Sequence, residues 1–200
     1  MYRAYNAAKR IIITIISSIL NFIKFSFWGV KYSNFPKTRG VVHVISHRRN
    51  SIVLGNSVVI NSGKHRNPVG AGGVQTVFNA TGDGRILIGN NVSMSNTTLV
   101  SKMEIKIGDG VMIGNGVTIY DTDFHSIQYS DRISKNDPSI ISKKVEIKEG
   151  AFIGAGSIIL KGVTIGRYSI VGAGSVVTKN IPDNEIWAGN PARFIRRLDQ

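Results

Sequence analysis

An aliphatic residue or Met at every sixth position is the feature of this 200-residue chain that most restricts its fold. The positions are Ile88, Met94, Val100, Ile107, Ile113, Ile119, Ile147, Ile153, Ile159, Ile165, Val171 and Val177. The residue that follows is often Gly, and a small or apolar residue usually comes four positions after the aliphatic one. A period of six is neither the 3.6 residues of an α-helix nor the two residues of a strand. We therefore expect each hexad to form one short strand and one turn.

Three such hexads close one triangular coil of about 18 residues, with the aliphatic side chain inside and Gly or Asn at the corners. Successive coils then pair as parallel strands about 4.8 Å apart and bury a continuous column of aliphatic side chains. The segment 54–60 has the same pattern of aliphatic residues with Gly and Asn between them, so coils are expected before the regular repeat begins. The fold class predicted is an all-β solenoid, a parallel β-helix of hexapeptide repeats.

The repeat also predicts the domain organisation. The interval from Ile119 to Ile147 is 28 residues, four more than a multiple of six, which indicates an extra loop at about 121–144 outside the coil. We assign 1–40 to a helix and linker, 41–182 to the β-helix, and 183–200 to a C-terminal tail.

Residues 1–28 have the pattern of an amphipathic α-helix. Its polar stripe contains Arg3, Asn6, Arg10, Thr14, Ser17, Asn21 and Lys24, and its wide opposite face contains Ile11, Ile12, Ile15, Ile16, Ile19, Leu20, Phe22, Ile23 and Phe27. The apolar run is too short and too often interrupted to cross a bilayer. A stripe of this kind fits attachment to a membrane surface, and it equally fits packing on the chain itself or on another copy.

Composition excludes several kinds of chemistry. The chain has no Cys, which rules out disulfides, thiolate metal sites and a cysteine nucleophile. Its net charge of +13 is concentrated near the N-terminus, where residues 1–82 contain eleven Lys and Arg but no Asp or Glu. Such a segment is attracted to an anionic membrane, to nucleic acid or to an anionic ligand. His43, His47 and His65 lie in this segment without a carboxylate, and we expect no metal site.

Three stretches of the chain resemble the hexapeptide-repeat acyltransferases, closest to the branch of maltose, galactoside and polysaccharide O-acetyltransferases. They are MSNTTLVS (94–101), IGDGVMIGNGVTIYDTDFHS (107–126) and the segment 153–196 with its GNPAR ending. The resemblance implies a left-handed β-helix, against the general right-handed rule for parallel crossovers. It also implies a homotrimer and acetyl-CoA as the donor.

His125 is the candidate catalytic residue. It is the one His inside the repeat region and lies where the hexad frame breaks. In the DTDFHS motif it matches the catalytic His of the family, which implies a general base for an acceptor hydroxyl. Asp121 and Asp123 flank it and would orient the imidazole or bind the acceptor, or simply be carboxylates of a surface loop. Asn96 matches an acceptor-contacting Asn of the family and is also typical of a solenoid turn.

The C-terminal stretch supplies the candidate donor site. By resemblance, Ala155 and Ala173 would line the pantetheine groove, and Thr178 and Lys179 would lie near its adenine end. Arg193 and Arg196 would bind the phosphates of coenzyme A, for which permanently charged guanidinium groups are suited.

The sequence therefore predicts an acetyl-CoA-dependent O-acetyltransferase acting on a sugar hydroxyl, in assembly of a cell-surface polysaccharide such as O-antigen or capsule. The acceptor would be a sugar or a lipid-linked saccharide, and nucleic acid is not expected as a partner. The expected location is the cytoplasm, with residues 1–30 available for contact with the inner membrane face. Two alternatives remain: acetyl transfer to an amino sugar, and a non-catalytic solenoid that binds anionic lipid or nucleic acid through residues 1–66.

Overall fold

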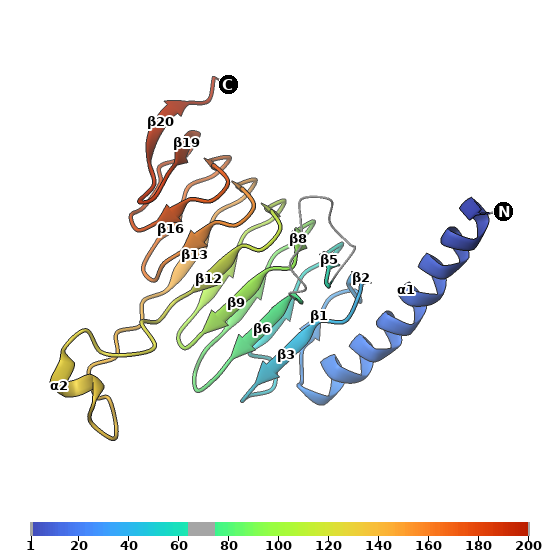
Figure 1. Cartoon of the computed structure of the whole chain (residues 1–200), viewed down its shortest axis with the longest axis horizontal. Helices are drawn as coiled ribbons and strands as arrows, with labels where there is room; N and C mark the ends of the chain where they lie inside the picture. The colour runs from blue at the N-terminus through green and yellow to red at the C-terminus, as the bar shows by residue number, and fades with distance from the viewer. Residues whose placement is uncertain (1, 64–74, 200) are drawn as a thin grey trace.

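The protein is a three-sided parallel β-helix with an α-helix at its N-terminal end (Figure 1). The computed structural model describes residues 2–63 and 75–199, and of residues 2–10 it describes the backbone alone. Consecutive strands lie on the three sides in turn, so neighbouring strands of one sheet are separated by one coil in the sequence.

The first sheet contains β1 (Lys31–Tyr32), β4 (Ile52–Leu54), β7 (Ile86–Ile88), β10 (Ile105–Ile107), β13 (Val145–Ile147) and β16 (Thr164–Ile165). The second contains β2 (Lys37–Arg39), β5 (Val59–Asn61), β8 (Ser93–Ser95), β11 (Met112–Ile113), β14 (Phe152–Ile153), β17 (Ile170–Val171), β19 (Glu185–Ala188) and β20 (Arg193–Arg197). The third contains β3 (His43–Ser46), β6 (Val77–Ala80), β9 (Thr98–Ser101), β12 (Thr118–Tyr120), β15 (Ile158–Ile159) and β18 (Val176–Val177). We call the turn from first to second sheet the first corner, that from second to third sheet the second corner, and that from third sheet back to the first the third corner.

The predicted column of aliphatic residues forms the core. Equivalent residues stack in register, as where Ile107 pairs with Ile88 below and Ile147 above. All the predicted inward positions are buried except Val100, whose place is taken by the fully buried Leu99. The reason is a second corner between β8 and β9 that is one residue shorter than the next, so Leu99 stacks on Ile119. The prediction of Val100 as a core residue is therefore wrong.

The ends of the coil are closed differently. At the N-terminal end β1 and β2 already pair within the sheets, so the coil includes part of the segment 1–40 assigned to helix and linker. At the C-terminal end β19 continues the second sheet in parallel and β20 adds to it in antiparallel direction. Between β12 and β13 the extra loop leaves the coil and contains the short helix α2 (Tyr129–Arg132), seen at the lower left of Figure 1.

The predicted amphipathic helix is α1 (Tyr2–Phe27), and its end is set by a glycine. Gly29 adopts a positive φ of 62°, a conformation in which a side chain would be strained and would also meet Arg49. The Val30 N–H then donates to the Phe25 carbonyl at 2.8 Å and the Gly29 N–H to the Ser26 carbonyl at 3.2 Å, as in a Schellman motif. This turn directs the chain from α1 into β1.

Candidate functional site

The loop 121–144 that carries His125 is anchored to the coil by a buried carboxylate. Asp121 is fully buried and accepts hydrogen bonds from the Ser101 hydroxyl at 2.7 Å, the Lys102 N–H at 2.8 Å and the Met103 N–H at 2.9 Å. The Asp121 carbonyl also accepts from the Lys143 N–H at 2.8 Å, where the chain returns to the coil. The point at which the loop leaves the third corner is therefore held from both sides.

Past this anchor the two arms of the loop run antiparallel for a short distance. Thr122 and Ser142 form an antiparallel bridge, and the Ser142 hydroxyl donates to the Thr122 hydroxyl at 3.0 Å. The Asp123 N–H donates to the Ile141 carbonyl at 3.1 Å, and the Asp123 carboxylate forms an ion pair of 2.6 Å with Lys161 of the next coil. These contacts fix the stem from which His125 projects.

His125 is paired with a carboxylate from the other arm of the loop. Its Nδ1 lies 3.1 Å from Oδ2 of Asp137, whose side chain is 13% exposed while the imidazole is 71% exposed. When Nδ1 carries the proton and donates it to Asp137, Nε2 has a free lone pair that faces solvent. This is the arrangement required of a base that takes a proton from a substrate hydroxyl.

Asp137 is held as a carboxylate by its own surroundings. The hydroxyl and the backbone N–H of Ser126 both donate to it, the latter at 3.0 Å. These hydrogen bonds, that of the Ser126 hydroxyl first, hold the pKa of Asp137 below its ordinary value against an opposing effect of burial, and the neighbouring His125 adds to the lowering. Arg132 of α2 donates at 3.1 Å to the carbonyls of Ser126 and Ile127, which secures the same arm of the loop. The carboxylate is thus available to orient the imidazole.

Asp137 was not among the residues singled out in the sequence. The flanking Asp121 and Asp123 were the candidates to orient the imidazole, and the structure pairs them with the coil instead. The loop follows no repeat, so no spacing connects position 137 with position 125. The only signal in the sequence is that the same loop contains two further acidic residues, Asp131 and Asp137.

Asn96 occupies a turn position at the second corner. Its φ is 47°, in the left-handed region that Asn tolerates, and the following coils have Gly116, Gly156 and Gly174 with the same sign of φ there. Its amide Nδ2 donates to Oδ1 of Asn115 at 2.8 Å, and its Oδ1 accepts from the Gly63 N–H at 2.7 Å. Both polar atoms of this buried side chain therefore have partners in neighbouring coils.

The candidate donor residues fall on three parts of the molecule. Ala155 and Ala173 stack at the second corner, where the Gly174 N–H donates to the Ala155 carbonyl at 2.8 Å and a side chain at Gly154 would come within 2.5 Å of the Ala173 nitrogen. Thr178 and Lys179 are exposed at the third corner. Arg193 and Arg196 are exposed on β20 at the C-terminal end of the coil.

Within one chain the candidate residues divide between two corners of the coil. His125, Thr178 and Lys179 belong to the third corner, whereas Asn96, Ala155 and Ala173 belong to the second, across the width of the third sheet. Lys179, Arg193 and Arg196 have no carboxylate within ion-pair distance in the described part of the chain, so their charges are available to an anion. Within residues 2–63 and 75–199 no group of three His, Asp or Glu side chains could hold a metal ion, and His65 lies outside these residues.

Comparison with known proteins identifies the repeat. Residues 144–179 match the family described as bacterial transferase hexapeptide (six repeats), and residues 101–121 match the hexapeptide repeat of succinyl-transferase. Mitochondrial gamma carbonic anhydrase 1 of Arabidopsis thaliana is 37% identical over an alignment of 101 positions that covers 44% of this chain. The chain spans 37% of the length of that relative.

Solved structures share the fold over most of the chain. AntD, an N-acyltransferase from Bacillus cereus in complex with dTDP and 3-hydroxybutyryl-CoA, has a TM-score of 0.67 and 21% identity, covering 89% of this chain and 87% of its own. A hexapeptide-repeat containing acetyltransferase from Vibrio cholerae has a TM-score of 0.52 and 22% identity, covering 97% of this chain and 93% of its own. The chain therefore has the fold of these proteins, a left-handed parallel β-helix, and its residues 101–121 and 144–179 match hexapeptide repeats of transferases.

Proposed function

We propose that the protein is an acetyl-CoA-dependent O-acetyltransferase that acts on a sugar hydroxyl, with His125 as its general base. The observation that carries this proposal is the pair of His125 and Asp137 on the loop 121–144, with Nε2 of the imidazole open to a substrate. Loops on a rigid solenoid are suited to building such sites.

The reaction needs one base and no covalent enzyme intermediate. The acceptor hydroxyl oxygen attacks the thioester carbonyl carbon as its proton passes to Nε2 of His125. The tetrahedral intermediate then collapses, the carbon–sulfur bond breaks, and the departing thiolate takes the proton back from the imidazolium. The products are an acetyl ester and coenzyme A with a free thiol. Asp137 supports the step by keeping Nδ1 protonated and the ring in place.

The donor would bind to exposed cations and to a shallow surface of the coil. Lys179, Arg193 and Arg196 are exposed cations without a carboxylate partner in the described chain. Such cations are free to bind the pyrophosphate and the 3′-phosphate of coenzyme A. The stacked Ala155 and Ala173 offer a shallow surface against which the thin pantetheine arm could lie.

A homotrimer would complete the site. The base is at the third corner and the proposed groove is at the second, so a neighbouring copy that sets its second corner against this loop would unite them. The loop presents exposed apolar side chains that such a copy could cover: Ile127 at 75%, Tyr129 at 68% and Ile133 at 65% exposed. A sheet-sided prism offers flat faces for symmetric association.

Transfer to an amine is the second candidate. It is favoured by the fold shared with AntD, one structure of which contains dTDP-4-amino-4,6-dideoxyglucose and coenzyme A. The same base and donor groove serve an amine as well as a hydroxyl. We propose a saccharide of cell-surface polysaccharide assembly, free or lipid-linked, as the acceptor, and the cytoplasm as the place of reaction.

An acceptor screen tests the proposal. Purified protein is supplied with acetyl-CoA and a panel of sugars, sugar nucleotides and amino-sugar nucleotides, and both free thiol and product mass are followed. We expect an acetyl ester whose formation needs His125. A product acetylated only on nitrogen would select the second candidate, and release of no thiol with any acceptor would overturn both.

A further inference from the structure

Helix α1 packs on the coil through the side that contains Ser17 and Asn21, and the fully buried Phe25 adds an apolar contact at the C-terminal end of the helix. Asn21 is fully buried: its Nδ2 donates to the Gly40 carbonyl at 2.9 Å and its Oδ1 accepts from the Val42 N–H at 2.9 Å. Ser17 is also buried and accepts from the Gly40 N–H at 3.3 Å. These bonds fix the rotation of the helix, so the opposite side must point away from the protein (Figure 1).

The side that points away is apolar and exposed, and only at its C-terminal end does it contact described residues of the chain, where Phe22 lies against Phe35 and Phe27 against Trp28. Its members are Ile11, Ile12, Ile13, Ile15, Ile16, Ile19, Leu20, Phe22, Ile23 and Phe27, and they are between 40% and 75% exposed. We call this set the α1 apolar face. At 100° per residue it covers more than half of the helix circumference. Continuous apolar surface of this extent indicates a contact with a partner or a membrane.

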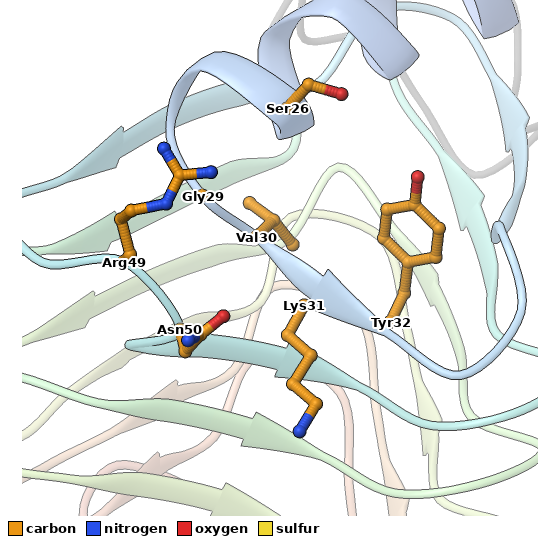
Figure 2. A pocket seen from close by; sticks show the side chains of 7 residues that line it. All are labelled: Ser26, Gly29, Val30, Lys31, Tyr32, Arg49 and Asn50. Carbon is orange, nitrogen blue, oxygen red and sulfur yellow. The ribbon is translucent and has the colours of Figure 1, made fainter.

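The charge around the helix favours an anionic lipid surface over a second copy. No Asp or Glu occurs in residues 1–82, and although Arg48 forms an ion pair with Asp83, Lys31 and Arg49 have no carboxylate within ion-pair distance among the described residues. Exposed Lys31 and Arg49 line a hollow of 370 Å³ at the end of α1, and the Arg49 guanidinium lies beside the last helical turn (Figure 2). Two copies joined through this end would bring like charges together, whereas anionic headgroups attract each Lys or Arg by about 1 kcal/mol.

The geometry of the helix also fits a position in the plane of a membrane. Among the described helices none is long and apolar enough to span a bilayer. A helix with a wide apolar face and cations beside it lies at the boundary of headgroups and acyl chains. We propose that α1 docks the protein on a membrane containing anionic phospholipids, with the α1 apolar face inserted at this boundary. This inference does not depend on the proposed acyl transfer.

Vesicle sedimentation of the full-length protein tests the proposal. The vesicles are phosphatidylcholine alone or phosphatidylcholine with phosphatidylglycerol. The double variant Ile16→Glu/Ile19→Glu changes two exposed side chains of the face, and Met112→Glu on β11 is the matched control at a comparably exposed apolar side chain outside the face. We expect the wild type and the control to bind the anionic vesicles, with at least about tenfold weaker binding to neutral vesicles, at high salt, or in the double variant.

Three outcomes would overturn the proposal. The first is a wild type that does not bind anionic vesicles, and the second is a double variant that binds them as well as the wild type. The third comes from sedimentation velocity without lipid: an oligomer that dissociates in the double variant but not in Met112→Glu shows that another copy covers the face. Circular dichroism of both variants verifies that the fold is intact.

Discussion

Replacement of Asp121 by Asn distinguishes a residue that holds the loop from one that contacts the acceptor. Asp121 is fully buried and accepts from two backbone N–H groups and one hydroxyl. An Asn of the same shape has only one acceptor oxygen, so in either orientation its NH₂ group faces the N–H of Lys102 or that of Met103. One backbone donor that faces this buried side chain is left without its partner.

The expected loss of stability follows from these contacts. An unsatisfied buried N–H costs about 1–3 kcal/mol, and hydrogen bonds to a neutral oxygen are each weaker than those to a carboxylate by about 1 kcal/mol. Relief of the cost of burying a charge offsets part of this loss. We expect Asp121→Asn to lower the free energy of unfolding by about 3 kcal/mol, which corresponds to a Tm lower by about 6–12 °C in a chain of this size.

Thermal unfolding at one fixed protein concentration measures the effect, with Asp123→Asn as the control. Asp123 pairs with Lys161 in a contact where both side chains are 23% exposed, and a pair of this kind contributes about 1 kcal/mol or less. The control should therefore change the Tm by only about 2–4 °C. An Asp121→Asn protein with unchanged Tm and greatly reduced turnover would refute the structural role and point to contact with the acceptor.

Further predictions concern the chemical step, the loop and the donor. His125→Ala should reduce kcat by about 10²–10⁴-fold while acetyl-CoA binding, measured by calorimetry, stays within a few-fold, and near-normal turnover would contradict the base assignment. Asp137→Asn should reduce kcat by about ten- to a hundredfold with little change in KM, and Asp137→Glu should restore part of it; a change confined to KM would speak against positioning. The folded-state pKa of Asp137 is lowered, so its contribution to loop stability is present above about pH 4 and is lost as the pH falls through the lowered pKa. Limited proteolysis of the loop should therefore accelerate in acid, and less so in the Asp137→Asn variant. Arg193→Ala and Arg196→Ala should weaken acetyl-CoA more than its dephospho analogue, and equal weakening would mean that these side chains do not contact the 3′-phosphate.

The repeat made most of the fold predictable, because each hexad meets an equivalent hexad one coil above and one below. An inward aliphatic at one position then requires another at the same position of the next coil, as for Ile107 and Ile147. Val100 shows the limit of this reasoning. A corner one residue short shifts the inward position to Leu99, and a strict period cannot register the shift because Leu and Val are equally apolar.

The site was predictable only in part. His125 could be found because it follows a break in a regular frame, and the motif around it resembles that of a known family. Its partner Asp137 could not, since contacts within an irregular loop depend on how the two arms meet. The hydrogen bonds of Ser126 to the Asp137 carboxylate and of Arg132 to the loop backbone fix the position of the two arms relative to each other.

For helix α1 the sequence alone determined that a polar stripe and an apolar face exist, because the period of a helix follows from the order of the residues. Only the tertiary structure decided which of them faces the protein. The first coil has no coil below it, so the carbonyl of Gly40 and the N–H of Val42 need other partners. Asn21 satisfies both, and an apolar side chain could satisfy neither. The unpaired backbone groups of the first coil therefore bind the polar stripe of α1, and the apolar face points away from the protein.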